Sequence, residues 1–126
     1  MSFSLEYRWE GIEQLKKALD RVPSKLRQIM HKKMDEKSKD VVFFAKHYVP
    51  VKTGYLRNSI YYRSVGFLEF LIEAYANYAG FVEYGTSKQR AQPYMRPSLE
   101  LVTLTLKNEL LQEILEYFAK ETGRIG

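Results

Sequence analysis

The sequence predicts an α+β fold, in which an antiparallel β-sheet packs against a long helix and a C-terminal helix closes the chain. Three observations predict it: strict apolar–polar alternation near the N-terminus, helical periodicity over 24–48, and two β-rich runs that flank Gly66. At 126 residues the chain is expected to be one domain, 1–126, with a core that needs no disulfide.

The N-terminal segment is predicted to open the sheet. Residues 3–9 place their apolar side chains on one face of a half-buried strand. Helical spacing then predicts a short helix from Ile12 to about Arg21, and Pro23 ends it. Ser24 is expected to cap the next helix, because its hydroxyl can accept a hydrogen bond from a free backbone N–H.

Residues 24–48 are predicted to form one long helix with an apolar stripe and a charged opposite face. Ion pairs on such a face contribute only about 0.2–0.5 kcal/mol each, so packing of the stripe on the sheet must hold the helix. His31 and His47 stand too far apart along it to share a ligand, and we expect surface or packing roles for both. The stripe consists of Leu26, Ile29, Met30, Met34, Val41, Ala45 and Tyr48.

A β-hairpin is predicted to follow. Pro50 breaks the long helix, and the turn after it ends at Gly54, which supplies backbone freedom. The runs 61–65 and 67–75 have high β-propensity and are joined near Gly66. The Lys-Thr-Gly of the turn lacks the earlier glycine of a phosphate loop, so its expected role is structural.

The closing helix is predicted from Pro97 to about Thr122, since proline is favoured in a first helical turn. Thr103 and Thr105 among leucines also fit a strand, but the spacing of three and four between apolar residues favours a helix. A second apolar set widens its surface, so part of it is expected to face another element or another subunit. That set is Leu101, Leu104, Leu111, Leu115 and Phe118.

Composition excludes several functional classes. The chain has no cysteine and two histidines, so thiolate chemistry is excluded, and we expect no metal and no cofactor. No apolar run reaches the roughly 18 residues of a membrane span, and the N-terminus lacks the pattern of a signal peptide, so no membrane contact is expected. The net charge of +5 fits a surface near nucleic acid or an acidic partner, and equally a soluble protein with no such partner.

Aromatics, charges and backbone breakers interleave most tightly in residues 78–97. Glu83 lies there among apolar residues and is expected to accept backbone or tyrosine hydrogen bonds, or to pair with Arg57 or Arg96. It could be combined with Glu73 as an acid–base pair, but no nucleophile, histidine or metal site accompanies them. We therefore expect no enzymatic activity.

A polar loop separates this acidic block from the closing helix. Gly85 is expected to adopt a positive φ and to end a short helix or strand. Residues 86–92 carry no large apolar side chain, and Pro93 and Pro97 stiffen the chain beyond them. A loop of this kind is expected to meet a partner, being mobile in the monomer and ordered in an assembly.

Three blocks stand in a fixed order: Val-Pro-Val-Lys-Thr-Gly-Tyr-Leu-Arg-Asn-Ser-Ile at 49–60, Phe-Val-Glu-Tyr-Gly-Thr at 81–86, and Gln-Pro-Tyr-Met-Arg-Pro at 92–97. Together they resemble the small neck proteins of lambda-like tailed bacteriophages and prophages, called head–tail joining or tail-completion proteins. The resemblance covers about residues 41–106 strongly and extends to the flanks only through their helical character.

The resemblance implies a non-enzymatic structural protein of the virion, assembled in the host cytoplasm. Its copies would form a homo-oligomeric ring at the neck that completes the tail and joins it to the DNA-filled head. Tail tube or terminator proteins and head-side connector proteins would be its partners, and DNA would pass through the channel without sequence-specific binding. The residues expected to shape this interface and present the loop are Thr53, Gly54, Leu56, Arg57, Glu83, Tyr84, Gly85, Thr86, Lys88, Arg90, Pro93, Tyr94, Arg96 and Pro97.

The alternative hypothesis is a small basic nucleic-acid-binding protein. It would combine the lysine and arginine surface with stacking by some of the ten tyrosines, although no recognised nucleic-acid-binding motif is present. Salt separates the two hypotheses, because phosphate binding weakens steeply as salt rises and an apolar subunit contact does not.

Overall fold

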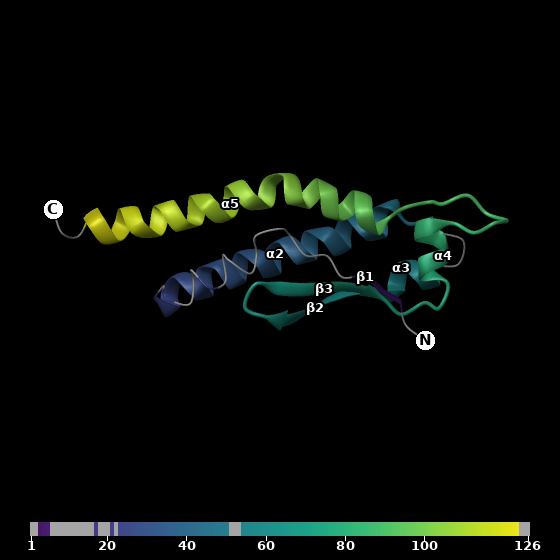
Figure 1. The fold of residues 1–126 in the computed structure, drawn as a ribbon, viewed down its shortest axis with the longest axis horizontal. Coiled ribbons are helices and arrows are strands. Elements are labelled where there is room, and N and C mark those ends of the chain that lie inside the picture. The colour runs from purple at the N-terminus through teal and green to yellow at the C-terminus, as the bar shows by residue number, and fades with distance from the viewer. Residues whose placement is uncertain (1–2, 6–16, 18–20, 22, 51–53, 124–126) are drawn as a thin grey trace.

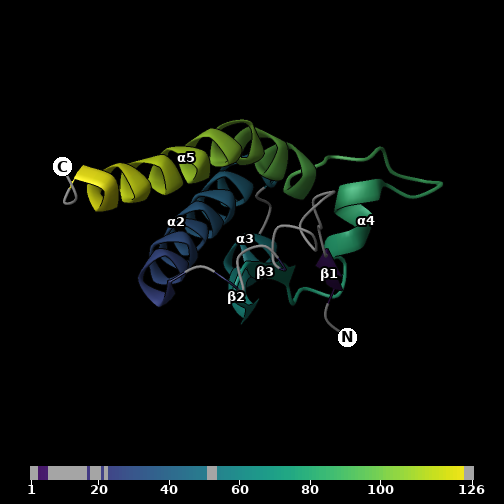
Figure 2. The same ribbon diagram turned by 60° about the vertical axis from the view of Figure 1, so that its left-hand side comes forward.

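The computed structural model describes residues 3–5, 17, 21, 23–50 and 54–123. The fold is α+β, as predicted. Helix α5 lies along α2, α2 covers the sheet, and the short helices α3 and α4 lie at one end (Figures 1 and 2). The elements are β1 (Phe3–Leu5), α2 (Ser24–Tyr48), α3 (Tyr55–Ser59), β2 (Ile60–Gly66), β3 (Glu69–Ala74), α4 (Ala79–Tyr84) and α5 (Met95–Gly123).

The sheet has three antiparallel strands in the order β1-β3-β2. The predicted hairpin is confirmed: Ile60 pairs with Ala74, and an irregularity between Ser64 and Gly66 precedes the turn. The N-terminal strand is confirmed over β1, where Phe3 also pairs with Ala74. Its predicted continuation to residue 9 lies outside the described residues. So does the helix predicted at 12–21, apart from Lys17, which is helical, and Arg21, which lies in a turn.

Helix α2 has the predicted bounds, but its predicted cap is wrong. Pro23 occupies the N-cap position without a side-chain hydrogen bond, and its carbonyl accepts from the backbone N–H groups of Leu26 and Arg27. Ser24 is therefore already the first helical residue, where its hydroxyl does not serve as the cap. At the other end Tyr48, predicted to belong to the buried stripe, is exposed.

The remaining stripe of α2 builds the core in two clusters. Toward its N-terminus, Leu26, Met30 and Met34 pack with Leu68 of the hairpin turn and with Leu106 and Leu110 of α5. Toward its C-terminus, Val41 and Ala45 join a cluster that includes Ile60, Ile72, Tyr94 and Val102. Because full burial of one large apolar side chain contributes about 1.5–3 kcal/mol, these clusters hold the helix layers and the sheet together.

Helix α3 was not predicted, since no element was assigned between the turn that ends at Gly54 and the β-rich run 61–65. Gly54, with φ +80°, precedes the helix, and its carbonyl accepts from Asn58 N at 2.9 Å. The Ser59 hydroxyl donates to Leu56 O at 2.8 Å and ends the turn. These local bonds form a single helical turn that is too short to show helical periodicity.

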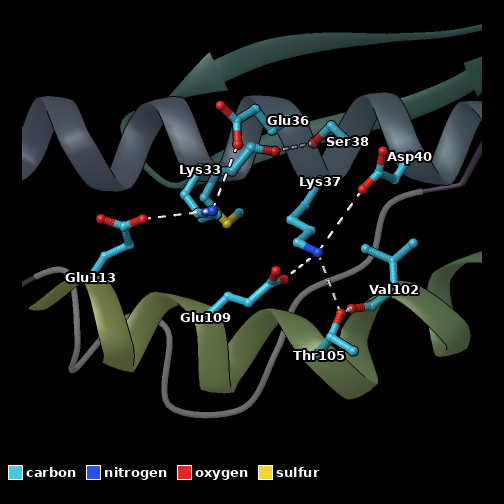
Figure 3. A network of polar contacts seen from close by, with 10 residues as sticks. Lys33, Glu36, Lys37, Ser38, Asp40, Val102, Thr105, Glu109 and Glu113 are labelled. Atoms are coloured by element: carbon cyan, nitrogen blue, oxygen red, sulfur yellow. Dashed lines mark hydrogen bonds and ion pairs between the residues drawn. The ribbon is translucent and has the colours of Figure 1, made fainter.

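Ion pairs flank the contact between α2 and α5 (Figure 3). Lys37 pairs with Glu109 and donates to the Thr105 hydroxyl at 3.4 Å, and Lys33 lies 3.6 Å from Glu113. The hydrogen bond from Lys37 lowers the pKa of Glu109 from its usual range. These pairs cross between the helices one turn apart and so support the register in which the apolar residues meet.

None of the helices among the described residues has the length and apolarity needed to cross a bilayer. In the same described part of the chain, histidine, aspartate and glutamate residues form no group of three or more that could hold a metal ion.

Two leucines of α5 that stand two positions apart, Leu104 and Leu106, test this packing. We expect Leu106→Ala to lower the free energy of unfolding by about 2–5 kcal/mol, because Leu106 is 3% exposed and its loss leaves a cavity in the core. Leu104→Ala removes the same atoms from a side chain that is 74% exposed, and should change it by less than about 0.5 kcal/mol in dilute protein. Chemical denaturation measures both, and equal losses would contradict the described orientation of α5.

Candidate assembly site

The carboxylate of Glu83 connects α4 to the beginning of α5. Its Oε1 accepts from Tyr94 N at 3.0 Å and Met95 N at 2.8 Å, and its Oε2 accepts from Arg96 N at 3.2 Å. Glu83 is completely buried. The amides at a helix N-terminus lack partners within the helix and carry a partial positive charge, so a carboxylate from another element is a favourable cap.

Arg96 completes this arrangement at the surface. Its Nε lies 3.3 Å from Glu83 Oε2, and its guanidinium carbon lies 5.3 Å from the centre of the Tyr84 ring. Of the partners predicted for Glu83, backbone amides and Arg96 are those found, whereas Arg57 lies exposed on α3. The buried carboxylate is therefore hydrogen-bonded and paired, as a buried charge requires.

Tyr94 fills the space between α4 and α5. It is fully buried, its hydroxyl donates to Ala79 O at 3.1 Å, and burial raises the pKa of Tyr94. The Ser98 hydroxyl donates back to Tyr94 O at 2.5 Å. We call Glu83, Tyr94 and Arg96, with these bonds, the α4–α5 lock.

The predicted positive φ of Gly85 is confirmed at +79°. Its N–H donates to Phe81 O at 2.8 Å and ends α4. A Cβ at this position would lie 2.7 Å from Ala91 N and 3.0 Å from Gln89 O, so there is no space for a side chain. Gly85 thus lets the loop return tightly against its own beginning.

The loop 86–92 lies between Glu83 and Tyr94 of the lock and connects α4 to α5. Thr86 N donates to Gln89 O at 2.9 Å, while the Thr86 hydroxyl accepts from Lys88 N at 3.2 Å and Gln89 N at 3.0 Å. Lys88 and Arg90 are exposed, and the connection between α4 and α5 projects beyond the helix layers (Figures 1 and 2). The change from a mobile to an ordered loop on assembly stays a prediction.

The structure brings the predicted turn block and the predicted loop together. Gly54 and Leu56 line a cavity of about 200 Å³ together with Arg90 and Gln92. Leu56 is itself buried, like Glu83, so both shape the fold, and their part in a partner interface stays a prediction. Thr53 lies outside the described residues. The other predicted residues Arg57, Tyr84, Thr86, Pro93 and Arg96 are exposed, and Pro97 is half-buried.

An exposed tyrosine cluster was missed by the sequence analysis. Tyr55 of α3 lies 5.9 Å from Tyr75 and 6.3 Å from Tyr78 between ring centres, and Tyr61 of β2 lies 6.4 Å from Tyr75. The four rings come from two stretches, 55–61 and 75–78, that only the folded chain brings together, so the number of tyrosines was the only signal in the sequence. Exposed tyrosines combine apolar area with a polar tip and are enriched at protein–protein contacts.

Beside this cluster, Glu73 is engaged in structural bonds. The Tyr61 hydroxyl donates to it, and Arg63 Nη2 lies 3.1 Å from its Oε1. The hydrogen bond from Arg63, followed by that from Tyr61, lowers the pKa of Glu73. Glu73 and Glu83 are thus held by different partners in separate places.

A small α+β protein with a buried, hydrogen-bonded lock, a projecting loop and an exposed aromatic cluster is a subunit suited to assembly with other proteins. Comparison with protein families supports that class: residues 13–85 match the family described as "Bacteriophage HK97-gp10, putative tail-component". The match covers more than half of the chain, and the protein belongs to this HK97-gp10-like family of bacteriophage tail components. No curated protein and no solved structure gave a significant match.

Removing the charge of the lock tests its contribution. We expect Glu83→Gln to lower the free energy of unfolding by about 1.5–3 kcal/mol. The charged acceptor is lost, and the NH2 group of glutamine would face backbone N–H groups, so that donor meets donor. Chemical denaturation measures the loss. Glu100→Gln on exposed α5 surface is the matched control and should stay within about 0.5 kcal/mol; an equally small effect at Glu83 would contradict the lock.

Gly85 gives a second test with an internal control. Gly85→Val should lower the melting temperature clearly, since a β-branched residue is strained at positive φ and its Cβ would strike the Ala91 backbone. Gly66→Ala is the control. Gly66 does not have a positive φ, and a Cβ there would lie at an ordinary contact distance of 3.6 Å from Glu69 Cβ, so the melting temperature should change little. Calorimetry on both variants checks this, and an unchanged melting temperature for Gly85→Val would refute the steric argument.

Proposed function

We propose that this tail component is a structural neck protein of a tailed phage. Its copies form a homo-oligomeric ring that completes the tail and joins it to the DNA-filled head, leaving a channel open for DNA. The proposal combines the family membership with the resemblance of the three sequence blocks to head–tail joining and tail-completion proteins. In this role the chain acts as one domain, 1–126, in the virion.

The α4–α5 lock carries this proposal. A loop can serve as a precise subunit contact only if the elements that hold it are rigid. Both ends of the loop 86–92 are held, by Gly85 at the end of α4 and by the Glu83 bonds to the first residues of α5. The loop with Lys88 and Arg90 is therefore a suitable contact for a neighbouring subunit or for the tail and head-side connector proteins.

A ring needs two different surfaces on each subunit, because its contacts are heterologous. The loop supplies one such surface. The exposed tyrosine cluster of Tyr55, Tyr61, Tyr75 and Tyr78 extends this surface, because Tyr78 lines the same cavity as Gln89 and Arg90 of the loop. We propose that the loop and the tyrosine cluster together form one half of the contact between neighbouring copies.

A structural role also fits the chemistry of the described residues. The two buried carboxylates, Glu73 and Glu83, are engaged by arginine, tyrosine and backbone groups that hold the fold. Neither is left for acid–base chemistry in this conformation, and we propose no enzymatic activity.

The proposal is tested in a phage or prophage that lacks the gene. Without the protein, electron microscopy should show filled heads and tails that remain unjoined, and the wild-type gene should restore virions that contain the protein. Lys88→Glu with Arg90→Glu reverses two exposed charges of the loop and should lower infectious particles at least about tenfold.

Lys120→Glu, an exposed charge change on α5, is the control and should leave the titre unchanged. Joined virions in the deletion, or virions that lack the protein, would overturn the neck role. A purified protein that binds DNA with steep salt dependence and does not support joining would favour the nucleic-acid hypothesis instead.

A further inference from the structure

Helix α5 has two apolar faces, and among the described residues only one of them packs against other elements. Val102, Leu106 and Leu110 face the core against α2. The other face carries large apolar side chains that are all exposed, among them Leu104 at 74% and Leu115 at 60%. We call this face the outer stripe: Leu101, Leu104, Asn108, Leu111, Leu115 and Phe118.

The spacing of the outer stripe is that of a coiled coil. From Leu101 to Phe118 the intervals are alternately three and four residues, so its members occupy successive a and d positions of heptads. Such a stripe forms a narrow seam that fits another helix of the same periodicity. A coiled coil of this length is marginal for a free helix, but α5 is already folded against α2, so pairing does not have to nucleate it.

Asn108 indicates what kind of helix covers the stripe. It is the single polar member of the seam, at an a position near its middle. Against an apolar surface its amide would lose water without gaining a hydrogen bond, which is unfavourable. Against a second Asn108 both amides are satisfied, because an asparagine side chain has donors and an acceptor. A single a-position asparagine is a known determinant of register and oligomeric state in coiled coils.

The flanking charges do not fit a membrane surface. A helix that lies on a bilayer carries lysine and arginine on both sides of its apolar face. The outer stripe is flanked by Glu100, Lys107 and Glu121 together with neutral residues such as Gln112. An acidic and mixed border instead suits a protein partner.

A groove lies beside the N-terminal half of the stripe. It has a volume of about 910 Å³ and is lined by Leu99, Leu101, Leu104 and Asn108 of α5 and by the exposed Tyr48 at the end of α2. The groove therefore offers additional apolar surface next to the seam, where the side chains of a partner helix can be accommodated.

We propose that two copies of this chain pair through their outer stripes in a parallel, in-register coiled coil, with Asn108 opposite Asn108. Such a pair is isologous and closed, with each stripe residue meeting its own copy. It does not rest on the neck ring, whose contacts we assign to other surfaces, and it can form in the absence of any phage partner.

The first test is the mass of the purified full chain by sedimentation equilibrium over a range of concentrations. The wild type should be a dimer, and Leu111→Glu with Leu115→Glu should raise the dissociation constant at least about hundredfold, because four charges would enter the apolar seam. Lys120→Glu lies on α5 outside the stripe and should remain dimeric. A wild type that is monomeric throughout, or a stripe variant that associates like the control, would overturn the proposal.

The second test determines orientation and register by cysteine cross-linking. The chain has no cysteine, so an introduced thiol can be oxidised only with its own copy. Asn108→Cys should give a covalent dimer in high yield, since facing a positions in a parallel pair can come within the roughly 4.4–6.8 Å between Cα atoms that a disulfide needs. Glu116→Cys, on α5 away from the seam, should not.

A cross-link that forms instead between Leu101→Cys and Phe118→Cys in a mixture of the two variants would show an antiparallel pair and overturn the parallel arrangement. Circular dichroism on each variant separates loss of pairing from loss of folding. Because these measurements need no phage, a failure here leaves the neck proposal standing. Joined virions in the deletion, together with an intact dimer of the purified protein, would overturn the neck role and leave the pairing standing.

Discussion

The hydrogen bonds of the Glu83 carboxylate to the first amides of α5 are the interaction on which the rest of the structure depends. A buried carboxylate is unfavourable unless it is paired, and helix-terminal amides are unfavourable unless they are capped. Each group satisfies the other here. Because the carboxylate comes from α4, this mutual requirement determines where α5 begins and therefore how the chain must travel between the two helices.

The position of α5 has consequences at its N-terminal end and along its length. At the N-terminal end, the connection from α4 must close within a short loop, which only the positive φ and missing side chain of Gly85 allow. Further along, the helix lies on α2 with its register supported by Lys33 and Lys37, and its inner face is buried against that helix. The outer face is then necessarily turned away from the core, which is why its leucines are exposed.

The sequence was informative where one physical requirement repeats along the chain. The stripe of α2 and the inner apolar set of α5 each reflect burial of every third or fourth residue, and periodicity detects this. The runs that flank Gly66 were found by their high β-propensity. Single local events gave no such signal: Pro23 took the cap position expected for Ser24, and Gly54 began a one-turn helix. The tyrosine cluster was out of reach because its rings are brought together by the tertiary fold. For Glu83 the partners were named correctly as a set, but only the folded chain selects Arg96 over Arg57.

The family match and the outer stripe concern different parts of the molecule. The matched residues 13–85 end at the glycine that closes α4, whereas α5 begins at Met95. The match therefore includes Glu83 but none of the amides that it caps, and none of the outer stripe. Membership in a tail-component family thus bears on the first part of the chain, while the surface of α5 has to be understood from its own chemistry. In the pairing that we propose, a second copy of α5 offers an apolar partner to each leucine of the outer stripe and an amide to Asn108, so one kind of partner satisfies every position of the seam.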